Sequence, residues 1–200
     1  MEKNQALSKK KRCEEKFFQS KQQLTELRQE AKDGKIVLAY LDESGFDAVH
    51  SNQYAWTKKG ERHLIQANRG ERLNVLGALL STGDFFAAKI WKNTTADLVA
   101  GFVSCLVDFI KADKKKIVIV LDNASVHTGK IMKDAVDFYK NKNIEFYFLP
   151  PYSPELNKIE RLWQKMKYNW MIAKRRTKKE LENDIENIIS GFGVKYRFDF

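Results

Sequence analysis

The chain has 200 residues, of which 43% are hydrophobic and 12% aromatic, which is enough for one domain with a substantial core. No apolar run approaches the roughly 18 to 20 uncharged residues of a membrane span, and the lysine-rich start is unlike a signal peptide, so neither a membrane nor a secreted protein is expected. Cys13 and Cys105 stand far apart without a metal-binding pattern, which argues against a disulfide framework or zinc site. We expect a cytoplasmic protein.

The formal net charge of +10 favours a polyanionic partner, because basic side chains neutralise phosphates and release counterions. Charge alone leaves ribosomal and other basic proteins open. The stretch from Arg161 to Lys179, however, holds eight basic residues and no acidic one, whereas solvated helix faces normally mix the two signs. The predicted DNA-binding residues in this basic stretch are Arg161, Lys165, Lys167, Lys174, Arg175 and Arg176.

Residues 1–34 are polar and lysine-rich, and we expect a helical basic extension with little core of its own, ended by Asp33-Gly34. The apolar segment 36–41 predicts a buried strand that runs directly into Asp42. Four segments with β character follow: 54–57, 63–66, 73–80 and 85–91. The last two are joined by a short polar loop with a glycine, which predicts an antiparallel hairpin.

Apolar residues at helical spacing predict a helix over 96–112, with Thr94 or Thr95 as its N-cap. A β-branched run at 117–121 predicts a second buried strand, and it again ends in an aspartate, Asp122. The remaining predictions are a helix over 129–142, a strand over 144–149, a helix opening at Ser153-Pro154, and a final helix from Thr177 with a Thr-x-x-Glu capping box.

This order predicts an α/β protein with a mixed five-stranded sheet flanked by helices, similar to a ribonuclease-H-like fold. We expect three parts: the extension 1–34, a catalytic domain 35–176, and a C-terminal helix and tail 177–200.

Two aspartates, Asp42 and Asp122, each follow a buried strand at its C-terminal end, where open α/β sheets commonly place ligand chemistry. A single aspartate after a strand is often a turn former or helix cap. If the two strands are neighbours, however, the carboxylates converge. Their joint occurrence therefore favours a shared site.

A third acid, Glu160, borders the apolar stripe of the helix expected after Pro154, so it points toward the sheet. Three gathered carboxylates repel one another and raise their pKa values, whereas divalent cations hold them ionised. Oxygen ligands without a cysteine or histidine cluster favour two Mg²⁺ or Mn²⁺ ions, which support phosphodiester attack. The predicted catalytic and metal-binding residues are Asp42, Asp122 and Glu160.

Other polar residues compete for these roles. Glu43, Asp47 and Glu155 lie close by in sequence, but Glu155 falls in the first turn of its helix, where it complements the helix dipole. Asn123 and His127 are candidate accessory residues; a structural role for His127 stays equally open. The four tryptophans are expected to pack rather than to stack on bases.

Three motifs, "LDESGF" (41–46), "VLDNASVH" (120–127) and "LPPYSPELNKIERLW" (149–163), resemble the catalytic blocks of DDE transposases in the bacterial insertion-sequence branch of the mariner superfamily. The resemblance spans about 37–170 and implies that Asp42, Asp122 and Glu160 are metal ligands. It also implies cleavage of double-stranded DNA at transposon ends, strand transfer into target DNA, and a homodimer or larger assembly at the bacterial nucleoid.

The chain departs from the family pattern in two places. Lys158 stands where proline is common, and the 34 polar residues at the start are too few for the usual helix-turn-helix domains. A helix-turn-helix protein from an upstream reading frame is therefore an expected partner. Two alternatives stay open: an inactive or regulatory DNA-binding remnant of a transposase, and a ribonuclease-H-like nuclease.

Overall fold

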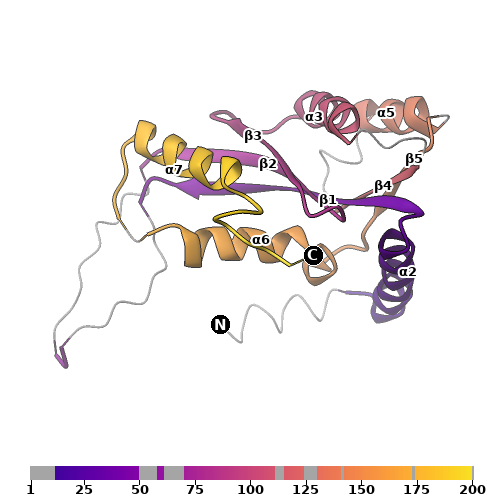
Figure 1. Cartoon of the computed structure of the whole chain (residues 1–200), viewed down its shortest axis with the longest axis horizontal. Helices are drawn as coiled ribbons and strands as arrows, with labels where there is room; N and C mark the ends of the chain where they lie inside the picture. The colour runs from indigo at the N-terminus through magenta and orange to yellow at the C-terminus, as the bar shows by residue number, and fades with distance from the viewer. Residues whose placement is uncertain are drawn as a thin grey trace.

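A computed structural model describes residues 12–49, 58–60, 70–110, 115–123, 130–140, 142–172 and 174–199 (Figure 1). In chain order the elements are α2 (Glu14–Lys32), β1 (Ile36–Asp47), β2 (Arg72–Leu80), β3 (Phe85–Ile90), α3 (Ala96–Phe109), β4 (Lys116–Leu121), α5 (Lys130–Lys140), β5 (Ile144–Phe148), the 3₁₀ turn η1 (Pro154–Leu156), α6 (Ile159–Lys165), the π-helical turn η2 (Met166–Trp170) and α7 (Lys178–Ser190). None of the helices in these ranges is long and apolar enough to cross a bilayer.

The five strands form one sheet in the order β3-β2-β1-β4-β5. β1 pairs antiparallel with β2 and parallel with β4, and β5 pairs parallel with β4. The predicted hairpin joins β2 to β3. The sheet is therefore mixed, as expected, and the two strands that precede the candidate aspartates are neighbours.

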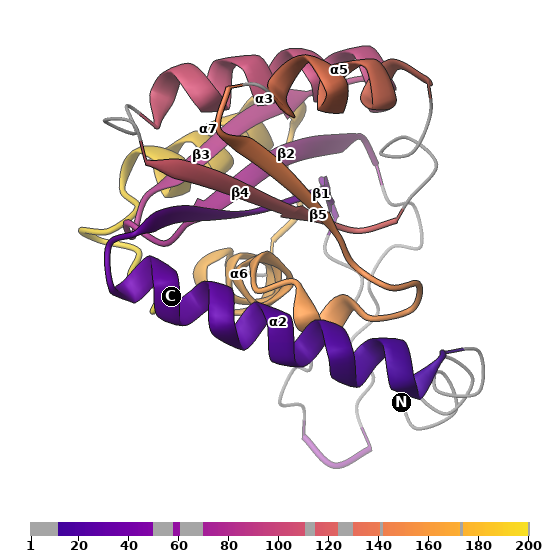
Figure 2. The same cartoon turned by 90° about the vertical axis from the view of Figure 1, so that its right-hand side faces the viewer.

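Helices cover both faces of the sheet (Figure 2). On one face α3 and α5 pack over alternate residues of β1 and β4, such as Ala39 and Ile119. On the other face α2, α6 and α7 pack over the intervening residues, such as Tyr40 and Val120. Since strand side chains alternate between faces, the even-numbered positions of both strands point toward α6.

Two of the helix start signals predicted from sequence are present, at α3 and α7. Thr95 caps α3 by accepting a hydrogen bond from the Leu98 N–H at 3.4 Å. Thr177 and Glu180 form the expected capping box at the start of α7. Segments 54–57 and 63–66, predicted to have β character, lie outside the described residues.

Two strand and helix predictions need correction. β1 does not end at Leu41 but continues to Asp47, because the additional residues pair with β2. The helix predicted to open at Ser153-Pro154 is broken at Asn157, whose extended backbone separates η1 from α6. The Ser153 side chain makes no cap hydrogen bond to this turn.

The segment 14–32 is helical as expected, but it buries more side chains in the hydrophobic core than its sequence suggested. α2 buries Phe17, Ser20 and Leu24 against the α6 face of the sheet. Polar contacts reinforce the packing, since the Tyr147 hydroxyl donates to Gln23 Oε1 at 2.6 Å. α2 therefore belongs to the packed layer rather than extending from it.

We predict that Leu24→Ala lowers the free energy of unfolding by about 2 to 5 kcal/mol, because the leucine is fully buried and its loss leaves a cavity. Chemical denaturation with circular dichroism measures the change. Gln22→Ala, on the exposed side of the same helix, is the matched control. Equal stability of the two variants would contradict a shared core.

Candidate active site

A pocket of about 360 Å³ opens beside the ends of β4 and β5, and its wall includes all three predicted carboxylates. Asp42, Asp122, Asn123, Asn157 and Glu160 line it together with the loop 149–154. Asp42 lies in β1, and Asp122 directly follows the last residue of β4, so both continue the even-numbered rows that face α6. Glu160, in the first turn of α6, lines the same pocket.

Asp42 does not lie at a strand end, as predicted, but at a change of pairing within β1. The last parallel pair between β1 and β4 is Tyr40 with Val120, while Asp42 itself pairs with Gly77 of β2. The carboxylate therefore stands on a strand held by β2 at the point where its pairing with β4 has stopped. This leaves room for the pocket beside it.

The electrostatic environment opposes ionisation of Asp42. Burial, together with the negative charges of Glu160 and Asp122, raises the pKa of Asp42 to about 7. Hydrogen bonds from the Glu43 backbone N–H and the Trp163 indole act in the opposite direction. The site thus concentrates negative charge beyond what its own hydrogen bonds neutralise.

The pKa of Glu160 is raised as well, and here a lysine opposes the shift. Burial raises the pKa of this carboxyl and Asp122 adds to the effect, while the nearby Lys167 ammonium lowers it. Burial and the positive charge of Arg72 in turn lower the pKa of Lys167. Lys167 follows Glu160 by two helical turns, which places its positive charge beside the acids.

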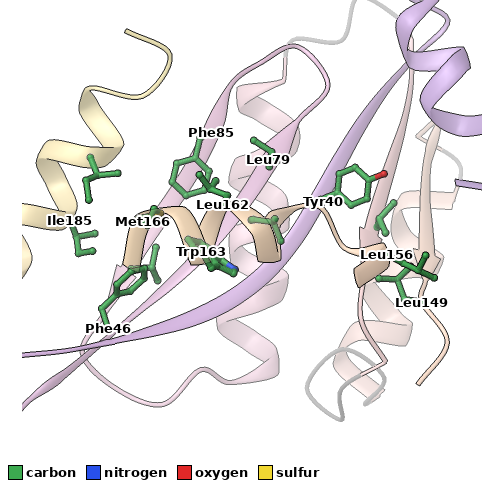
Figure 3. Packing of buried hydrophobic residues seen from close by; sticks show 14 of the residues in the cluster. Tyr40, Phe46, Leu79, Phe85, Leu149, Leu156, Leu162, Trp163, Met166 and Ile185 are labelled. Atoms are coloured by element: carbon green, nitrogen blue, oxygen red, sulfur yellow. The ribbon is translucent and has the colours of Figure 1, made fainter. Parts of the chain in front are cut away.

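Trp163 was expected only to pack, and it also contacts the site directly. Its ring lies edge-on to Phe46 and Phe85, with centroids 6.1 and 5.7 Å away (Figure 3). Its Nε1–H donates to Asp42 Oδ2 at 3.1 Å. The indole has room in this position because β2 carries Gly77 opposite Asp42. A Cβ added at Gly77 would lie 2.6 Å from the indole ring.

The competing acids lie elsewhere. Glu155 is absent from the pocket wall and forms an ion pair with Arg12. Asp47 is 3.9 Å from Arg72, with which it pairs near the far end of β1. Glu160 thus lines the pocket and Glu155 does not, and the two belong to different elements. Asn123 lines the pocket, whereas His127 lies outside the described residues.

The basic stretch divides into residues with different surroundings. Arg161, Lys174 and Arg175 have exposed side chains, and Lys174 Nζ lies 3.5 Å from Asp184. Lys165 donates to the Arg197 carbonyl at 2.8 Å. Lys167 lies close enough to Glu160 to lower the pKa of this pocket acid.

Arg176 requires a correction, because it is enclosed rather than available to DNA. Its side chain has no exposed surface, and its Nε donates to Asp184 at 2.7 Å. The other guanidinium nitrogens donate to the carbonyls of Lys174 and Ile172. Arg176 therefore fixes the segment before α7.

The donor set fits a hard divalent cation, since the pocket offers carboxylate oxygens and an amide side chain. The raised pKa of Asp42 is the observation that supports this fit, because a cation would supply the missing countercharge. Within the described residues, no three His, Cys, Asp or Glu side chains are close enough together to hold one ion. The acids line a common wall rather than meeting at one point.

A sequence profile of the DDE superfamily endonuclease family matches residues 37–182. The chain belongs to this family. The match covers β1 through the first turns of α7 and thus all three pocket carboxylates. This match confirms the resemblance of the three motifs to the DDE family.

Solved structures share the fold of this DDE family member at low identity. A Mos1 transposase paired-end complex with the left transposon end matches with a TM-score of 0.68 and 14% identity, over 90% of this chain and 55% of that chain. The Mos1 transposase catalytic domain with Raltegravir and Mg matches with a TM-score of 0.61 and 15% identity, over 90% and 81%. These matches confirm the ribonuclease-H-like fold.

A curated protein matches this chain over a shorter stretch. The uncharacterized protein y4pE/y4sA of Sinorhizobium fredii (strain NBRC 101917 / NGR234) is 43% identical over 54 residues, which are 27% of this chain and 36% of that protein. This chain thus covers less than two thirds of the length of y4pE/y4sA and of the Mos1 chain in the paired-end complex.

We predict that Asp42→Asn raises the melting temperature of the cation-free protein by a few degrees at pH 8. The pKa of Asp42 is about 7 in the folded protein but about 4 in an unfolded chain, so the folded state binds the proton more tightly. The contribution of Asp42 to stability therefore falls as pH rises from about 4 to about 7 and then stays constant.

Thermal unfolding between pH 4.5 and 8 measures this effect. Asp134→Asn, an exposed charge on α5, is the matched control. Mg²⁺ should stabilise the unsubstituted protein at pH 8 and the Asp42→Asn variant much less. A stability gain from Asp42→Asn that is the same at both ends of the pH range would refute the electrostatic explanation.

We predict that Trp163→Phe raises the pKa of Asp42 further, on the order of one unit, because it removes a hydrogen bond to the ionised carboxylate while keeping an aromatic ring. The pH at which Mn²⁺ binding is half-maximal should move upward by a similar amount in calorimetric titrations. Trp170→Phe, whose ring packs on Phe192 and Tyr196, is the control. An unchanged midpoint for Trp163→Phe would show that the indole does not tune the acid.

Proposed function

We propose that this chain catalyses metal-dependent cleavage of double-stranded DNA at transposon ends and transfers the freed 3′ end into target DNA. The observation that carries the proposal is that Asp42, Asp122 and Glu160, from three different elements, line one pocket. Membership of the DDE family supports the same three residues as the catalytic acids.

Each of these residues has a defined role in the proposal. Asp42, Asp122 and Glu160 hold two Mg²⁺ or Mn²⁺ ions, which when bound activate the attacking hydroxyl and stabilise the leaving oxygen. Trp163 orients Asp42 and favours its ionised form. Lys167, half-buried beside the acids, is placed to bind a phosphate of the scissile strand.

The Mos1 transposase structures support this proposal by analogy. They include paired-end complexes with Mn and with Mg, and a strand transfer complex. For this chain, the corresponding proposal is that Arg161, Lys165, Lys174 and Arg175 contact the DNA backbone, with Asn123 and His127 as accessory residues. A homodimer or larger assembly on DNA, a helix-turn-helix partner, and a place at the bacterial nucleoid complete it.

We predict that Asp122→Ala abolishes DNA cleavage while DNA binding survives, since it removes a cation ligand without changing the basic surface. Purified protein is incubated with Mn²⁺ or Mg²⁺ and DNA that carries the ends of its own element, and nicks are counted on denaturing gels. Glu155→Gln, which alters a nearby acid outside the pocket, should cleave at the rate of the unsubstituted protein.

Other outcomes assign the chain differently. Equal residual cleavage in Asp122→Ala would contradict the catalytic assignment. Tight DNA binding without cleavage by the unsubstituted protein would indicate a regulatory remnant. Preference for RNA–DNA hybrids or branched substrates over linear duplex would indicate a ribonuclease-H-like nuclease.

A further inference from the structure

Asn157 lies between η1 and α6, three residues before Glu160. Its side chain is 2% exposed, and its extended backbone interrupts the helix between η1 and α6. The Asn157 N–H donates to the Pro154 carbonyl at 2.9 Å, and its own carbonyl accepts from the Glu160 N–H at 3.2 Å. The residue therefore closes the η1 turn and accepts a hydrogen bond from the first turn of α6, which carries Glu160.

The side chain of Asn157 reaches across to β1. Its Nδ2 donates to the carbonyl of Leu41 at 3.1 Å, one residue before Asp42. The amide orientation is fixed by chemistry, because a carbonyl can only accept and the atom facing it must be the nitrogen. One residue thus connects both acid-bearing elements, through its side chain to β1 and through its backbone to α6.

The amide oxygen of Asn157 has no hydrogen-bond donor among the described residues. Asn157 Oδ1 is buried and accepts no hydrogen bond from any described residue. Such an orphaned acceptor is costly, and buried polar atoms in folded proteins are nearly always satisfied. Because Asn157 also lines the carboxylate pocket, the missing donor is best supplied by what binds there.

We propose that Asn157 is a positioning residue that sets the separation of Asp42 and Glu160, and that its Oδ1 accepts a hydrogen bond from the hydration shell of a divalent cation bound in the pocket. The proposal rests on the metal-dependent function above and assigns a new residue to it. Asn157 adds no charge to a pocket already crowded with carboxylates, which suits an outer partner rather than a fourth acid.

The test measures Mn²⁺ affinity by calorimetry on the full chain without DNA, together with thermal stability without metal. Asn157→Ala should weaken Mn²⁺ binding by roughly 10- to 100-fold, as loss of an outer-shell partner does. Asn157→Asp, which keeps an acceptor but loses the donor to Leu41, should be less stable without metal and should weaken Mn²⁺ binding less than Asn157→Ala does.

Asn74→Ala provides the matched control. Asn74 is also buried, and its Nδ2 likewise donates to a backbone carbonyl, that of Lys92 at 3.1 Å, but it lies outside the pocket. This variant should lose stability and keep the Mn²⁺ affinity of the unsubstituted protein. Should Asn157→Ala not fold, Asn157→Ser takes its place in the same comparison.

The outcomes separate this inference from the proposed function. Unchanged Mn²⁺ affinity in Asn157→Ala, or an equal loss in Asn74→Ala, overturns the inference. Equal loss in Asn157→Ala and Asn157→Asp overturns the role of Oδ1. Mn²⁺ binding by an unsubstituted protein that cleaves no DNA refutes the function alone, whereas absence of Mn²⁺ binding refutes both.

Discussion

The parallel register between β1 and β4 is the constraint on which the site depends. Each strand alternates its side chains between two covered faces, so Asp42 and Asp122 share a face only because both continue the same even-numbered row. A shift of one residue in either strand would send one acid toward α3. The buried β-branched rows on both faces hold the register, and the geometry of the acids follows from the packing of the core.

That geometry brings negative charges together, and the surrounding residues offset their repulsion only in part. An indole, a backbone N–H and the Lys167 ammonium each favour ionised carboxylates, yet burial and mutual repulsion still keep the pKa of Asp42 near 7. A protein without a ligand for this pocket would gain nothing from such an arrangement. Unfavourable charge gathered on a rigid sheet is the physical basis for assigning cation chemistry to the pocket.

Features with local causes were predictable from the sequence. The buried strands, the β2–β3 hairpin and the caps at Thr95 and Thr177 follow from short patterns. Features with distant partners were not. The extra length of β1 comes from β2, the break at Asn157 accompanies a bond to Leu41, and Arg176 is buried because Asp184 lies within reach. The hydrogen bond from Trp163 to Asp42 links residues far apart in the chain, so no local pattern announces it.

Gly77 affects the pocket acids although it lies outside the pocket. It carries no functional group, but it stands opposite Asp42 on β2, and the indole of Trp163 fills the space that any side chain there would take. The ionisation of Asp42 thus depends partly on the absence of a side chain at residue 77 of β2. A side chain introduced at Gly77 would displace the indole and so change the ionisation of Asp42, although residue 77 itself lies outside the pocket.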